Sequence, residues 1–81
     1  MELKDTINLM NSEDYKERFK AEYYQTMARY NNLFIMLIKY KAGTLEFEPT
    51  CPVEILKDQE YYMRNYLKTL EVRAKIEKIE L

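Results

Sequence analysis

The chain has 81 residues and a formal net charge of −1, and it contains eight tyrosines, one cysteine and no histidine or tryptophan. A proton shuttle near neutral pH usually needs histidine, and a zinc site needs several Cys or His ligands, so the composition predicts a binding protein without metal or cofactor rather than an enzyme. Because no strong positive field is present, duplex nucleic acid is not an expected partner.

The hydropathy pattern predicts no membrane span. The longest unbroken apolar run, residues 33–38, is far shorter than the roughly 20 residues needed to cross a bilayer. The first residues carry acids where a signal peptide has a basic region, and a single cysteine fits a reducing compartment. We therefore expect a cytoplasmic protein.

Strong helix breakers occur only near the middle of the chain, where Gly43, Pro49 and Pro52 fall within ten residues. Ser12 is a good N-cap for a helix over 13–42, which Gly43 would close in the left-handed conformation. After a turn over 43–51, Cys51 or Thr50 would cap a second long helix over 52–79, with Pro52 in its first turn. With a short helix over 3–10, the whole chain, 1–81, is expected to form a single all-α domain. Its main part would be an antiparallel two-helix hairpin.

Helical periodicity assigns a hydrophobic seam to each long helix. Tyr30 lies in this seam and Tyr23 borders it, whereas Tyr24 and Ile79 are expected to point outward. The apolar run 33–38 faces every side of its helix, which a lone hairpin cannot bury. We therefore expect a helical homo-oligomer. The seam residues on the two helices are Tyr15, Phe19, Thr26, Tyr30, Leu33 and Leu37, and Leu56, Met63, Leu67, Leu70 and Ala74.

Beside this seam, each long helix carries one row of polar and aromatic residues, and the two rows should meet on the same side of an antiparallel pair. We call this surface the arginine flank. A turn centred near residue 47 would place Glu22 level with Arg73, and Arg29 level with Tyr66. The flank consists of Arg18, Glu22, Arg29, Met36 and Tyr40 from the first long helix, and Gln59, Tyr62, Tyr66 and Arg73 from the second.

Two interpretations of this flank stay open. In the first, Glu22 and Arg73 form an inter-helix ion pair that holds the helices in register, and Arg18 is the additional arginine that this pair does not use. In the second, the arginines outnumber the carboxylates, so a guanidinium beside Tyr15 or Tyr66 holds a phosphate while the ring stacks on a base.

The same residues carry a resemblance. The stretch 15–22, followed by 56–59 and by Met63, Tyr66, Leu70 and Arg73, resembles a family of small crAss-phage-related proteins, similar to the helical hairpins that act as anti-CBASS and anti-Thoeris sponges. The resemblance covers roughly residues 15–77. It implies a phage counter-defence protein of the host bacterial cytoplasm that sequesters a cyclic oligonucleotide or a cyclic ADP-ribose-type signal without cleaving it.

The resemblance also implies roles for individual residues. Arg18 and Arg73 would contact phosphates, Tyr15 or Tyr66 would stack on a base, and Glu22 would orient an arginine or accept from a base edge. Arg29, in the same row, completes the candidate ligand-binding set. Two other functions are compatible with the pattern: a module that inhibits a host protein by occlusion, and a phage structural or assembly protein.

Overall fold

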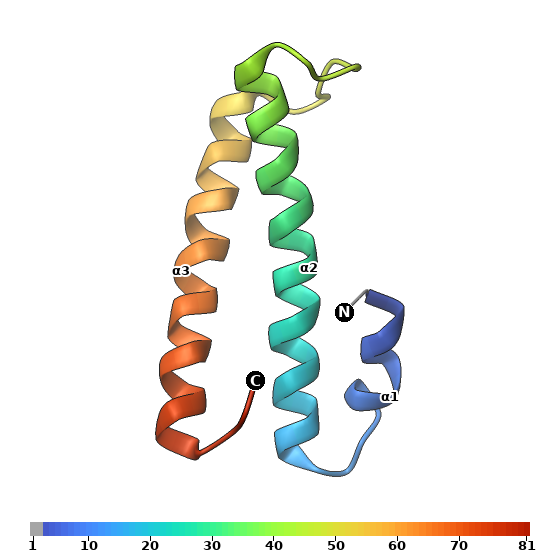
Figure 1. Cartoon of the computed structure of the whole chain (residues 1–81), viewed down its shortest axis with the longest axis vertical. Coiled ribbons are helices and arrows are strands. Elements are labelled where there is room, and N and C mark those ends of the chain that lie inside the picture. Colours follow the sequence, from blue (N-terminus) through green and yellow to red (C-terminus); the bar gives the residue numbers. More distant parts are fainter. Residues whose placement is uncertain (1–2) are drawn as a thin grey trace.

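The computed structural model describes residues 3–81 as an all-helical protein whose two long helices, α2 (Tyr15–Ala42) and α3 (Val53–Glu77), lie antiparallel (Figure 1). A 3-10 turn, η1 (Leu3–Thr6), leads into the short helix α1 (Ile7–Met10). These N-terminal elements contact α2 and not α3, so α2 is the central element of the fold. The expected helical hairpin preceded by a short helix is confirmed.

Helix α2 begins two residues later than expected because a different side chain caps it. Asp14 adopts an extended backbone, and its carboxylate accepts a hydrogen bond from the Lys16 amide at 2.9 Å. Ser12, the expected cap, instead accepts from the Asp14 amide at 3.0 Å and so shapes the preceding turn. At the other end, Gly43 has φ 77° and closes the helix as predicted.

Helix α3 is shorter at both ends than the expected 52–79. Pro52 occupies the cap position with no side-chain hydrogen bond, so neither Thr50 nor Cys51 caps this helix. At the C-terminal end Lys78 takes a left-handed conformation with φ 57°, and the Ile79 amide donates to the Ala74 carbonyl at 2.8 Å. This cap reverses the chain direction, which buries Ile79 at 6% exposure instead of leaving it outside.

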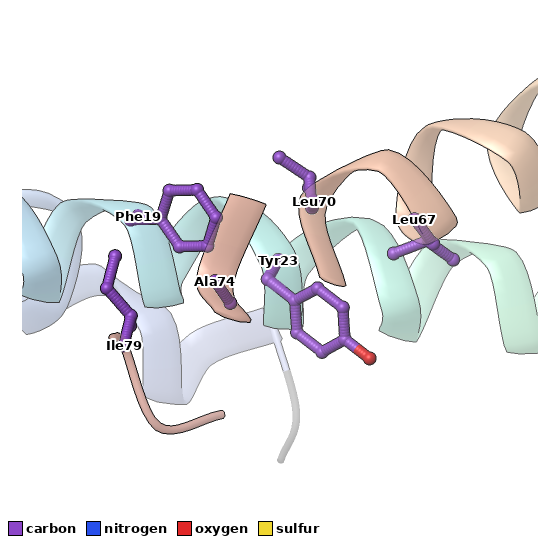
Figure 2. Packing of buried hydrophobic residues seen from close by; sticks show 6 residues of the cluster. All are labelled: Phe19, Tyr23, Leu67, Leu70, Ala74 and Ile79. Atoms are coloured by element: carbon purple, nitrogen blue, oxygen red, sulfur yellow. The ribbon is translucent and has the colours of Figure 1, made fainter. Parts of the chain in front are cut away.

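We call the end of the hairpin opposite the connecting loop the open end. The buried core, whose packing Figure 2 shows, lies in the half of the hairpin nearer this end. Tyr23 belongs to this core, and Tyr24, expected to point outward, is half-buried against it. The N-terminal elements pack on the opposite face of α2. There, Ala21 of α2 and Thr6 of η1 are completely buried. The core consists of Phe19, Tyr23, Leu67, Leu70, Ala74 and Ile79.

Candidate functional site

The structure brings the two rows of the arginine flank together on one side of the hairpin, as their equal rotational sense predicts. Tyr66 on α3 donates its hydroxyl hydrogen to the Glu22 carboxylate on α2. Two turns nearer the open end, Arg73 donates through Nη2 to the Tyr15 hydroxyl. Four of the six candidate residues therefore bridge the two helices in pairs.

The register of this flank differs from the expected one. Glu22 faces Tyr66 rather than Arg73, and Arg73 faces Tyr15, so the expected ion pair between Glu22 and Arg73 does not form. The cause is the path of the loop: α3 starts below the end of α2 (Figure 1), with Val53 lining the same groove as Leu37. The middle of the loop therefore does not mark the level at which the helices pair.

Arg73 is held by three neighbours at the open end. Its Nε donates to Glu77 Oε2 at 3.0 Å, and its guanidinium lies 4.9 Å from the centre of the Phe19 ring. The Tyr15 hydroxyl and, after it, the Arg73 guanidinium lower the pKa of Glu77. Because a guanidinium has five N–H groups, Arg73 keeps donors for a ligand, although its charge is already partly compensated.

The other two arginines of the flank differ in their surroundings. Arg18 donates through Nη1 to the Ser12 carbonyl at 2.9 Å, which ties it to the turn before α2. Arg29 is exposed and makes no hydrogen bond or ion pair to any residue within 3–81. Continuing the pairing of Glu22 with Tyr66 by seven residues on each helix places Arg29 level with Gln59.

Exposed tyrosine rings lie on the same flank as Arg29. Tyr62 lies one turn from Gln59 on α3 and is 69% exposed, compared with 41% for Tyr66, the other α3 tyrosine on this flank. An exposed ring beside an uncompensated guanidinium offers both a stacking surface and an anion contact. The structure therefore adds Tyr62 to the candidate residues, and its position on the flank was the signal in the sequence.

The opposite flank contains two tyrosine–glutamate bonds that the sequence analysis missed. Tyr23 donates to Glu71 at 3.1 Å, and Tyr30 donates to Glu60 at 2.9 Å. Burial, followed by the bond to Glu71, raises the pKa of Tyr23. A glutamate beside the seam of one helix, near the level of a tyrosine on the other, is the pattern that would have indicated these bonds.

Two hollows open between the helices. One, of about 660 Å³, lies at the open end beside Tyr23 and the last residues of the chain. The other, of about 420 Å³, lies at the loop end, and we call it the loop-end notch; it is lined by Phe34, Leu37, Ile38, Tyr40, Lys41, Val53, Lys57 and Glu60. Within residues 3–81, no group of His, Cys, Asp or Glu side chains is arranged to hold a metal ion. In the same range no helix is long and apolar enough to span a membrane.

The fold defines a small all-helical hairpin protein with exposed tyrosines and arginines along one side. Residues 13–76 match the family model of Sequestin, and because this match covers most of the chain, the chain belongs to the Sequestin family. The family name denotes sequestration, which is a binding function rather than catalysis. Searches of curated proteins and of solved structures find no match.

Proposed function

We propose that this chain is a phage counter-defence protein that binds a small immune signalling nucleotide on the arginine flank and withholds it from its effector without cleaving it. The ligand class is a cyclic oligonucleotide or a cyclic ADP-ribose-type molecule. Membership of the Sequestin family supports the sequestering role. The chemistry of the flank supports an anionic ligand with an aromatic part.

The observation that carries the ligand class is the environment of Arg29. Its guanidinium is exposed and lacks a partner within residues 3–81, and it shares the flank with the exposed rings of Tyr62 and Tyr66. Arginine binds phosphate oxygens in a bidentate manner, and an aromatic ring stacks on any base. Arg29 would therefore contact a phosphate, and the neighbouring tyrosines would hold the base.

The other candidate residues would extend this site toward the open end. Arg73 keeps N–H groups beyond those that reach Glu77 and Tyr15, and Arg18 lies at the same end of α2. Glu22 holds Tyr66 in place through their hydrogen bond, which orients the ring for stacking.

A thermal-shift screen with cyclic dinucleotides, cyclic trinucleotides and cyclic ADP-ribose isomers tests the proposal. A ligand present at 100 times its dissociation constant stabilises the folded state by about 2.7 kcal/mol. Recovery of the intact ligand after heat release distinguishes sequestration from hydrolysis. If no member of the panel raises the melting temperature, sequestration of these ligands is excluded.

Arg29→Ala is the variant that locates the site. It should abolish the ligand-induced shift without changing the melting temperature of the free protein, because Arg29 bonds to nothing within residues 3–81. Arg64→Ala is the matched control: Arg64 pairs with Glu60 on the opposite flank and should leave ligand binding intact. Equal loss in both variants would argue against a site on the arginine flank.

Inhibition of a host protein by occlusion is the second candidate function. It is favoured by the exposure of Tyr15, Tyr40, Tyr62 and Tyr66 along one side of the hairpin, since exposed tyrosines are frequent anchors of protein interfaces. Pull-down with the wild-type chain and with Tyr62→Ala separates this function from sequestration. A host protein captured only by the wild type, together with no nucleotide shift, would favour occlusion.

A further inference from the structure

The loop-end half of the hairpin is poorly covered compared with the open-end half. All six residues of the buried core lie toward the open end. Near the loop the seam residues Leu33, Leu37, Leu56 and Met63 are only half-buried. The apolar surface extends outward on α2 through Phe34, Ile35 and Ile38, with exposed fractions of 43%, 50% and 52%.

The loop-end notch combines this apolar surface with basic residues. Its apolar lining includes Leu37, Ile38 and Val53. Its charged lining consists of Lys41, Lys57 and Glu60, and the Glu60 carboxylate is already paired with Arg64 at 2.9 Å. Lys41 has no hydrogen-bond or ion-pair partner in the described part of the chain. Among residues 3–81, Lys57 pairs only with Glu54, one turn away at 3.5 Å, and such exposed pairs contribute little to stability. The notch therefore fits an apolar group flanked by negative charges.

The connecting loop presents such a group at the same end of the molecule. Phe47 is 58% exposed and lies between Glu46 and Glu48, both of which are exposed as well. Neither glutamate has a hydrogen-bond or ion-pair partner among residues 3–81. An exposed phenylalanine between two carboxylates is complementary, in apolar character and in charge, to an apolar notch with two lysines.

We propose that two copies of this chain pair loop end to loop end about a twofold axis, with Phe47 of each copy inserted into the loop-end notch of the other. Glu46 and Glu48 would then lie beside Lys41 and Lys57 of the second copy. Because the loop and the notch lie at the same end, a twofold axis makes both contacts at once, as a self-complementary interface requires. The pairing would also cover the apolar surface of Phe34 and Ile38. It leaves Arg18 and Arg73, at the open end, accessible.

Sedimentation equilibrium of the purified chain over a range of concentrations tests this pairing, and we expect a dimer. Phe47→Ala removes the inserted ring, and Ile38→Asp places a carboxylate in the apolar lining of the notch. Each should weaken the dimer at least tenfold while helicity stays unchanged, because both side chains are exposed in the single chain. Ile76→Asp is the matched control: Ile76 is 73% exposed on α3 near the open end, and its substitution should leave the dimer intact.

Mixing experiments test the reciprocity of the contact. Phe47→Ala protomers keep a normal notch and Ile38→Asp protomers keep the phenylalanine, so a mixture of the two should associate through one intact contact more strongly than either alone. Glu46→Lys with Glu48→Lys should weaken the dimer, and mixing with Lys41→Glu, Lys57→Glu protomers should restore association. Failure of both mixtures to associate would overturn the proposal.

Other outcomes also overturn the pairing, and the nucleotide shift separates its failure from that of the proposed function. A wild-type monomer at every concentration, or a dimer that Ile76→Asp dissolves and Phe47→Ala does not, would contradict it. The nucleotide shift is measured on the same variants. If Ile38→Asp abolishes that shift and leaves the dimer intact, the notch is the ligand site and not a contact between copies.

Discussion

Tyr66 on α3 donates a hydrogen bond to the Glu22 carboxylate on α2, and this bond connects the two long helices on the side that carries the candidate site. It fixes the level at which the helices pair on this flank. The same bond raises the pKa of Tyr66, because the phenol must keep its proton to donate it.

Tyr66→Phe is therefore expected to lower the free energy of unfolding slightly. The bond lies at the surface, where water can replace the lost donor, so the loss should be about 0.5 kcal/mol. Urea denaturation measures it. Tyr62→Phe, which removes a hydroxyl with no partner in the described chain, should change nothing; an equal loss in both variants would mean that the bond to Glu22 contributes no stability.

The free energy of unfolding should fall at alkaline pH, in part because Tyr23 then loses its proton. Burial and the bond to Glu71 raise its pKa above the usual 10.0, so the folded state holds this proton more tightly than the unfolded state does. The resulting stabilisation is complete below pH 10.0 and is lost as the pH rises through the higher pKa of the folded state. Melting temperatures measured from neutral pH upward should fall less steeply above that pH in Tyr23→Phe than in the wild type. Tyr62→Phe serves as the exposed control, and parallel slopes for all three proteins would contradict this assignment.

Ile79→Ala should destabilise the fold more than its place after the last helix indicates. Ile79 is 6% exposed within the core, and removing a buried isoleucine typically costs at least about 2 kcal/mol. Ile76→Ala provides the comparison, since Ile76 is 73% exposed and its truncation should have almost no effect. Thermal denaturation of the pair measures the difference. Equal melting temperatures would show that the chain after α3 does not pack on the core in solution.

Lys78→Gly should stabilise the protein. Lys78 has φ 57°, a left-handed conformation that costs a residue with a Cβ atom roughly 1 kcal/mol and costs glycine almost nothing. The gain should be smaller than that, because glycine also loses more entropy on folding. Gly43→Ala is the reverse change at φ 77°, and it should destabilise even though nothing lies within 4 Å of the added Cβ atom. Chemical denaturation of both variants should therefore give shifts of opposite sign, and shifts of the same sign would contradict this account.

The hairpin itself was predictable because its boundaries depend on local chemistry. Gly43 ends α2 as expected, since the left-handed cap favours a residue without a Cβ atom. The start of α2 was predicted two residues too early, with Ser12 as the cap, although Asp14 can also accept hydrogen bonds from nearby amides. Only the conformation of the turn decides which of them caps the helix.

The register and the end of the chain could not be read from periodicity. Periodicity fixes which face of a helix meets its partner, and it correctly placed Glu22, Tyr66 and Arg73 on one flank, whereas Tyr15, which it assigned to the seam, accepts a hydrogen bond from Arg73 on that flank. It does not fix how far one helix slides along the other. That displacement depends on the path of the loop, and the burial of Ile79 depends on a reversal at Lys78, a residue type that seldom adopts the required conformation.

Helix α2 lies between α3 and the N-terminal elements, so the two sides of the molecule should unfold locally at different rates. The N-terminal elements contact α2 alone, for example where Gln25 Nε2 donates to Met10 Sδ at 3.6 Å, and they share no contact with α3. Brief opening of this segment therefore exposes one face of α2 and leaves the hairpin closed, whereas loss of α2 removes both its packing against α3 and its packing against the N-terminal elements. Backbone amides of the first helix should exchange with solvent deuterium long before those around Leu70, and the molecule would lose its order from the N-terminal edge inward.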